Sequence, residues 1–173
     1  MLPYLLAFCR ITISLTFTYS FLMKVGDVNQ FAQTVANFKL VPLRWERPLA
    51  LLFLSGEAAV VVFLVIGGQQ LLPLAFGLTL LLLLAFTAAL ALVLVRDIQT
   101  SCNCFGNTQK TVSYVDVWRN AGLILVSAIG LWTAGNVKGT LNLIELFLIA
   151  IIAIIFVLLW TNLTDIVTLF QTA

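Results

Sequence analysis

The chain has 173 residues, of which 62% are hydrophobic and 9% are charged, and its formal net charge is +2. Soluble domains average roughly 45–50% apolar and about 25% charged residues, so this composition indicates an integral membrane protein. The small net charge and the scattered lysines and arginines exclude nucleic acid as a partner. The absence of histidine removes the commonest metal ligand and the usual proton carrier near neutral pH.

A bilayer core of about 30 Å is crossed by about 20 mostly apolar residues in a helix. Five stretches meet or nearly meet this requirement, at residues 4–23, 49–66, 72–95, 117–134 and 143–160. We therefore predict an all-α membrane bundle of about five transmembrane helices, a four-helix core plus one, in contact with the lipid bilayer. A length of this size suits a single domain over residues 1–173. The first span lacks a basic leader, so we expect a retained helix and not a signal peptide.

The segment 27–40 between the first two spans is too polar to cross a membrane but carries apolar residues at helical spacing. These residues are Val28, Phe31, Ala32, Val35, Ala36 and Phe38. The pattern predicts an amphipathic helix that lies at the membrane interface, with an ordinary polar loop as the alternative.

Two charged residues fall well inside predicted spans, Arg10 in the first and Glu57 in the second. Intramembrane charges are costly and usually have a partner, so each is a candidate partner for the other. The alternative is that Arg10 extends to the nearer surface while Glu57 is protonated. Lys24 ends the first span and Arg119 opens the fourth, and solvated helix ends account for both.

The loop 96–116 between the third and fourth spans contains two cysteines one residue apart, Cys102 and Cys104. A structural zinc site needs four ligands, and this loop offers two thiolates and no imidazole, so we predict no metal site. A disulfide within Cys-x-Cys closes a small, strained ring, which favours a pair that cycles between dithiol and disulfide. Two unreactive thiols are the alternative. Phe105 and Gly106 suggest a loop of defined shape.

Five crossings place this loop, the amphipathic segment and the C-terminus on one side of the membrane. Cys9 lies near the other side, separated from the loop by most of the bilayer, and cannot be a disulfide partner of the pair. A lone cysteine on an apolar helix is usually a small buried hydrophobe.

The stretch Cys102-Asn103-Cys104-Phe105-Gly106 resembles the Cys-x-Cys-Phe-Gly signature of the MauE branch of the DoxX/MauE membrane proteins. Further features placed as in that family are Arg10, Lys24-Val25, Val41-Pro42, Ser55-Gly56-Glu57 and Arg119-Asn120. The family is implicated in maturing an extracytoplasmic, disulfide-rich dehydrogenase subunit alongside a thioredoxin-like partner. The resemblance therefore implies disulfide exchange on the outer side of a membrane.

The basic residues argue for the opposite orientation. Most of them lie on the side of the cysteine loop, and the positive-inside rule would place that side in the cytoplasm, where disulfides seldom persist. We follow the resemblance and expect an extracytoplasmic loop in a bacterial-type inner (cytoplasmic) or thylakoid membrane.

The leading functional hypothesis is a membrane thiol–disulfide oxidoreductase. Cys102 and Cys104 would exchange with a thioredoxin-fold partner or another membrane-complex protein, and quinone near Phe105 and Arg119 is the candidate electron carrier. The alternative is a non-catalytic assembly or scaffold subunit of a larger complex. A transporter using Arg10 and Glu57 ranks last, because the spans lack broken helices and repeat symmetry.

Overall fold

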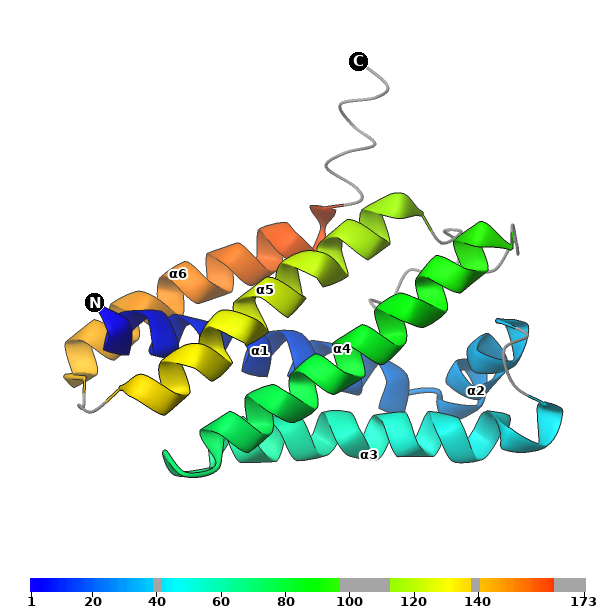
Figure 1. Cartoon of the computed structure of the whole chain (residues 1–173), viewed down its shortest axis with the longest axis horizontal. Helices are drawn as coiled ribbons and strands as arrows, with labels where there is room; N and C mark the ends of the chain where they lie inside the picture. Colours follow the sequence, from blue (N-terminus) through cyan, green and yellow to red (C-terminus); the bar gives the residue numbers. More distant parts are fainter. Residues whose placement is uncertain (39–41, 97–112, 138–140, 164–173) are drawn as a thin grey trace, which may run out of the picture.

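The computed structural model describes residues 1–38, 42–96, 113–137 and 141–163, and the ordered elements in these ranges are all helical (Figure 1). The elements are α1 (Leu2–Val25), α2 (Val28–Asn37), a 3₁₀ turn η1 (Leu43–Trp45), α3 (Glu46–Val65), α4 (Leu72–Val95), α5 (Tyr114–Asn136) and α6 (Leu143–Thr161). All of them except α2 and η1 are long and apolar enough to cross a membrane, which gives five candidate spans. The predicted all-α, five-span fold class is confirmed.

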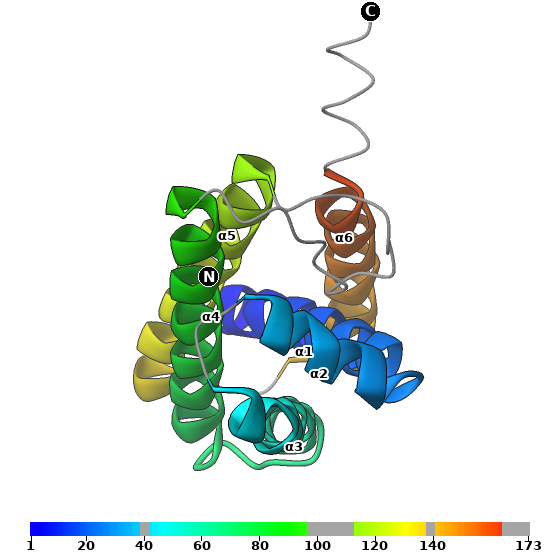
Figure 2. The ribbon, with the colours of Figure 1, turned by 90° about the vertical axis from the view of Figure 1, so that its right-hand side faces the viewer.

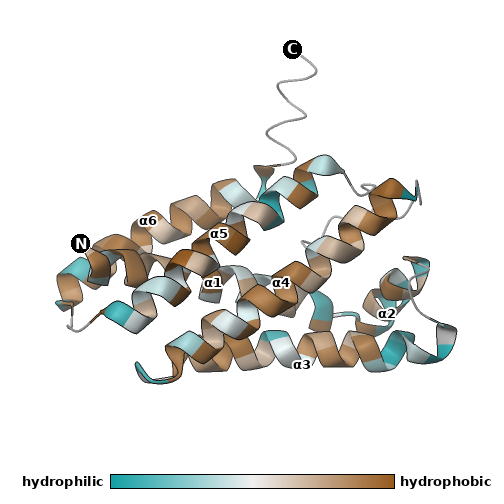
Figure 3. Cartoon of the chain, viewed as in Figure 1, coloured by the Kyte–Doolittle hydropathy of each residue, from teal (hydrophilic) through white to brown (hydrophobic). Residues whose placement is uncertain are grey.

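Four of the long helices form a closed bundle, and the fifth packs outside it. Helix α1 contacts α3 and α5, while α4 closes the ring by contacting the same two helices; α6 packs on α1. The view along the bundle shows α1 between α3 and α6, with α4 and α5 together on one side of it (Figure 2). This is the predicted core of four helices plus one. The long helices are mostly hydrophobic along their length, with hydrophilic residues mainly near their ends (Figure 3). Many of their large hydrophobic side chains are exposed on the outside of the bundle.

The starts of α1, α4, α5 and α6 each carry a local signal in the sequence. Pro3 and Pro73 stand in the first turns of α1 and α4, where a missing N–H costs nothing. Ser113 and Asp116 form a capping box at the start of α5, and Asn142 and Glu145 form another at α6. The first of these boxes starts α5 at Tyr114, ahead of residue 117 where hydropathy alone placed the span.

Helix α2 is the short amphipathic helix expected between the first two spans. Asp27 caps it by accepting a hydrogen bond from the Gln30 backbone N–H at 2.9 Å. Its buried residues Phe31 and Ala32 pack with Ala50 of α3. The predicted helix is therefore confirmed over residues 28–37, and the alternative of an irregular loop is wrong there. The last two residues of the predicted segment, 39 and 40, lie outside the described residues.

Two glycines allow helices to approach α5 closely. A Cβ atom on Gly130 would overlap the ring of Phe76 from α4, and one on Gly122 would overlap the ring of Trp160 from α6. Small residues of this kind let membrane helices pack backbone to side chain, where no hydrophobic effect drives association. The Trp160 indole N–H also donates to the Arg119 carbonyl at 3.1 Å, which fixes the end of α6 against α5.

Candidate functional site

The four motif residues Cys102, Cys104, Phe105 and Gly106 lie outside the described residues, so their chemistry remains a prediction. The structure does describe the two helices that hold this loop. Helix α4 ends at Val95 and α5 begins at Tyr114. The part of the candidate site whose geometry the structure describes is therefore the set of polar groups near this end of the bundle.

The central feature at this end is a buried ion pair between Lys24 of α1 and Glu57 of α3. The Lys24 ammonium nitrogen (Nζ) donates to Glu57 Oε1, and the two side chains are only 4% and 7% exposed. The Ser20 hydroxyl donates to the same carboxylate oxygen at 3.4 Å. An ion pair this deeply buried is stable only when both charges are compensated, so each residue depends on the other.

Aromatic rings complete the surroundings of the ammonium group. Lys24 Nζ lies 5.0 Å from the ring centroid of Phe31 and 5.8 Å from that of Phe86. Aromatic faces attract cations at such distances and take the place of water. Because Phe31 comes from α2, the amphipathic helix helps to close the site. The expectation that Lys24 is a solvated helix end is therefore wrong.

A stripe of polar residues on α1 leads to this pair. Thr12, Thr16, Ser20 and Lys24 recur every four residues, which places them on one face of the helix. All four residues are buried, with exposures between 0% and 7%. This spacing was present in the sequence and could have indicated that Lys24 faces the bundle interior.

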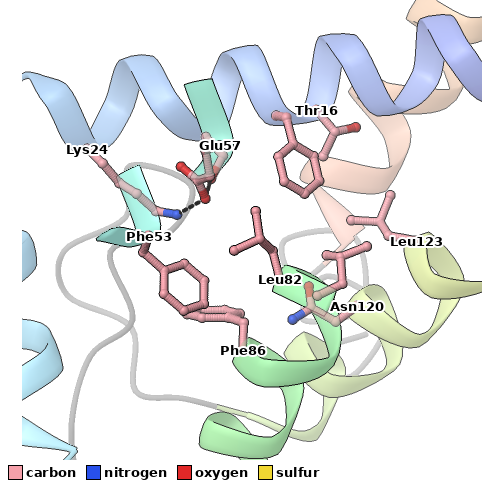
Figure 4. A pocket seen from close by; sticks show the side chains of 11 residues that line it. Thr16, Lys24, Phe53, Glu57, Leu82, Phe86, Asn120 and Leu123 are labelled. Atoms are coloured by element: carbon pink, nitrogen blue, oxygen red, sulfur yellow. Dashed lines mark hydrogen bonds and ion pairs between the residues drawn. The ribbon is translucent and has the colours of Figure 1, made fainter. Parts of the chain in front are cut away.

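A small cavity lies beside the ion pair. Its volume is about 40 Å³, its wall is almost entirely apolar, and the lining residues include Thr16, Ser20, Lys24, Glu57 and Asn120. Apolar side chains from α3, α4 and α5, including those labelled Phe53, Leu82, Phe86 and Leu123 in Figure 4, form the remaining wall. The cavity therefore joins groups from four of the long helices that are far apart in the sequence.

Two polar atoms at this cavity have no hydrogen-bond partner among the described residues. They are the second carboxylate oxygen of Glu57, Oε2, and the side-chain amide nitrogen of Asn120, Nδ2. The carboxylate oxygen is an acceptor and the amide nitrogen is a donor. Sequence analysis did not select Asn120 as a site residue, although it follows Arg119 directly.

Arg10 does not bind Glu57. Its Nε donates to the Leu64 carbonyl at 2.5 Å, and its Nη2 donates to the carbonyls of Val65 and Gly67 at 3.2 and 3.3 Å. These carbonyls belong to the last turn of α3 and the residues after it, which lack helical partners. Arg10 thus caps the C-terminus of α3 at the end of the bundle away from Lys24. The predicted pair of Arg10 and Glu57 is therefore wrong. Arg10 does extend to the nearer end of the bundle, as the alternative expected, but Glu57 has a partner in Lys24.

Arg119 belongs to a second, partly buried ion pair at the start of α5. Its Nη2 lies 3.1 Å from Asp116 Oδ1, and the side chains are 8% and 14% exposed. The other oxygen of Asp116, Oδ2, accepts hydrogen bonds from the Ser113 backbone and hydroxyl at 3.0 and 3.3 Å. Arg119 is therefore not a solvated helix end either, and its pair anchors the point where the cysteine loop joins α5.

Two further features bear on the candidate site, the lone cysteine Cys9 and the possibility of a metal site. Cys9 is a free thiol that is 1% exposed and belongs to the main hydrophobic core, as expected for a small hydrophobe. Within the described ranges, no group of three or more His, Cys, Asp or Glu side chains is arranged to hold a metal ion.

Comparison with known proteins gives one consistent result. Residues 2–133 match the family model described as "Methylamine utilisation protein MauE". The chain is 38% identical over 134 residues to the methylamine utilization protein MauE of Paracoccus denitrificans, covering 75% of this chain and 71% of that protein. No solved structure matches. The matched region contains the four-helix core and the cysteine loop, whereas α6 lies beyond it.

Proposed function

The chain belongs to the MauE family of multi-pass membrane proteins, and on this premise we propose that it is a thiol–disulfide redox protein acting in protein maturation. The family description makes methylamine utilisation its proposed physiological setting. The observation that supports the redox proposal most directly is the Cys102-Asn103-Cys104 pair in the sequence between α4 and α5. The Lys24–Glu57 and Arg119–Asp116 ion pairs are found toward the end of the bundle where α4 ends and α5 begins.

The proposed reaction has two parts. In the first, a thiolate of a reduced thioredoxin-fold partner attacks the disulfide between Cys102 and Cys104, and the partner's second thiol resolves the mixed disulfide, which leaves the partner as a disulfide and the pair as a dithiol. This exchange transfers the oxidised state between proteins without net loss of electrons. In the second, a membrane quinone takes two electrons and two protons from the dithiol, which becomes a disulfide while the quinone becomes a quinol. The same reactions run in reverse if the protein acts as a reductant.

The proposed setting is the bacterial inner membrane, with the cysteine loop on the extracytoplasmic side. An oxidising compartment allows the disulfide to persist, and extracytoplasmic proteins are the substrates that need it. The buried side chains of Lys24 and Arg119 weaken the charge argument against this orientation. Both residues are held inside the bundle by carboxylates, so they are not free basic groups of a cytoplasmic loop.

The proposal is tested with serine variants of the two loop cysteines and a purified thioredoxin-fold protein in its disulfide form. Each single variant, Cys102→Ser or Cys104→Ser, keeps one of the two thiols. The variant that keeps the attacking thiol and lacks the resolving thiol should trap a mixed disulfide with the partner, visible on a non-reducing gel. The double variant should form none, and Cys9→Ser should behave as the parent protein. If the double variant still supports maturation while its partner stays bound, the protein is an assembly subunit and the redox proposal is wrong.

A further inference from the structure

A larger cavity lies at the end of the bundle away from Lys24. Its volume is about 600 Å³, and its lining comes from α1, the ends of α3 and α5, the start of α4 and the first half of α6. These segments meet because the N-terminus, the turn between α3 and α4, the end of α5 and the start of α6 all lie at one end of the bundle (Figure 1). Pockets that hold small organic ligands measure about 300–1,000 Å³. The cavity is therefore large enough to bind a ligand.

Arg10 is the charged residue among the described residues that line this cavity. Its Nε and Nη2 atoms donate to three carbonyls at and after the end of α3, which hold the guanidinium group in place. Its Nη1 atom carries two further N–H groups and has no hydrogen-bond partner among the described residues. No described carboxylate forms an ion pair with Arg10, and its side chain is only partly buried. The cavity therefore offers a positive charge with two donors left for a ligand.

The contacts of Arg10 place its guanidinium group near the membrane interface. Nη2 donates to the carbonyl of Gly67, which lies in the turn between the two spans α3 and α4. A turn that joins two spans lies at the level of the lipid head groups. The cavity extends from there toward the middle of the membrane, since Leu15 of α1 lines it about 7 Å deeper than Arg10, at ~1.5 Å per residue. Ile11 of α1 and Ala150 of α6 also line this inner part, so it is apolar.

We propose that this cavity binds one anionic phospholipid, with its phosphate on the Arg10 guanidinium and an acyl chain in the apolar part between α1 and α6. Arginine suits phosphate because its planar array of donors matches the phosphate oxygens. Basic pockets between transmembrane helices are typical binding sites for anionic head groups. A soluble anion would leave the apolar part of the cavity empty, whereas an uncharged apolar molecule would leave Arg10 without a counter-charge.

A lipid at this site would connect helices that have few direct contacts. The cavity is lined by Leu64 and Val65 at the end of α3 and by Leu146 and Ala150 of α6. Helix α6 packs on α1 and lies beyond the region that matches the family model. The bound lipid would therefore help to hold α6 against the four-helix core. This site is independent of the cysteine chemistry, because it lies at the opposite end of the bundle from the start of α5.

The test is native mass spectrometry of the full-length protein in detergent, titrated with phosphatidylglycerol or with phosphatidylcholine of the same acyl chains. The parent protein should bind the first phosphatidylglycerol about fivefold more tightly than the first phosphatidylcholine, as expected for one basic group near a membrane surface. Arg10→Gln should bind the two lipids equally. A parent protein that binds both lipids equally has only the ordinary lipid shell of a membrane protein, and that result would overturn the inference.

A second pair of variants leaves Arg10 and its carbonyl contacts intact. Ala150→Phe fills the apolar part of the cavity from α6 and should abolish the preferred binding of the first phosphatidylglycerol. Ile151→Phe is the matched control on the same helix, because Ile151 is 40% exposed and is not among the described residues that line the cavity. This control should bind lipid like the parent protein. Equal binding by the Ala150→Phe and Ile151→Phe proteins would rule out this cavity as the site.

A measurement on the parent protein alone covers the case in which a variant fails to fold. Phosphatidylglycerol with a photoreactive diazirine in its acyl chain should label α1 near Leu15 and α6 near Ala150, and unlabelled phosphatidylglycerol should compete. Glycerol 3-phosphate, which has the anion without the acyl chains, should not compete. Label spread over the outer faces of all the helices, or competition by glycerol 3-phosphate, would overturn the inference. Either result would leave the proposed redox function untouched, since that is tested on the cysteine variants.

Discussion

The buried ion pair between Lys24 and Glu57 leads to a prediction about stability that is independent of activity. Removing one partner leaves the other charge buried without compensation, which typically costs about 3–5 kcal/mol. Lys24→Met should cost close to this range, because Glu57 then retains only the 3.4 Å hydrogen bond from Ser20. Glu57→Leu should cost less, because the ammonium keeps two aromatic faces worth about 0.5–2 kcal/mol each.

The double variant should reverse most of this loss. Replacing a buried ion pair by apolar side chains of similar volume is often neutral, or stabilising by about 1–4 kcal/mol, since no charge then has to leave water. We expect Lys24→Met/Glu57→Leu to lie within about 1 kcal/mol of the parent or above it. Reversible unfolding in mixed micelles, followed by tryptophan fluorescence, measures all four proteins. A double variant whose loss equals the sum of the single losses would refute the buried pair.

Three further predictions concern residues away from the pair. Gly122→Ala should displace the ring of Trp160, destabilise the protein by about 1–3 kcal/mol and shift its tryptophan fluorescence. The control Gly77→Ala should be neutral or slightly stabilising, because a Cβ atom at Gly77 meets nothing within 4 Å. Equal effects of the two substitutions would contradict the close contact between α5 and α6. Arg10→Leu should lower the midpoint temperature of thermal unfolding, because it removes three hydrogen bonds to backbone carbonyls at the end of α3. Arg10→Lys should recover little of this loss, because lysine lacks the planar guanidinium group. Full recovery with lysine would argue against the capping role. Cys9 should resist an impermeant maleimide until the protein is denatured, and labelling of the native protein would disprove its burial.

The architecture was predictable because bilayer thickness constrains sequence directly. A helix that crosses a membrane needs a long apolar run, and the five runs correspond to the five long helices. The short helix α2 was predictable for a related reason, since its apolar residues recur at helical spacing. The start of α5 was placed too late, because hydropathy does not register the capping box of Ser113 and Asp116.

The partners inside the bundle were not predictable from the same signals. Arg10 and Glu57 were matched because both lie deep in their spans, yet depth along a helix does not determine which helices face each other. In the structure, Arg10 binds backbone carbonyls at the end of α3, and Glu57 forms an ion pair with Lys24. Lys24 stands at a helix end, where solvent is the usual expectation, but Glu57 of α3, Phe31 of α2 and Phe86 of α4 surround its ammonium group. Asn120 became a site residue only through packing of α5 against the cavity.

The central claim is that Cys102 and Cys104 form a redox-active pair outside the cytoplasm. The most direct measurement is labelling of intact cells with a membrane-impermeant maleimide, with and without prior external reduction, on a Cys9→Ser background in which only the loop thiols report. We expect labelling only after external reduction, which would reveal an extracytoplasmic disulfide. Labelling that appears only after lysis and needs no reductant would reveal reduced cytoplasmic thiols, and the pair would then not be an extracytoplasmic redox site.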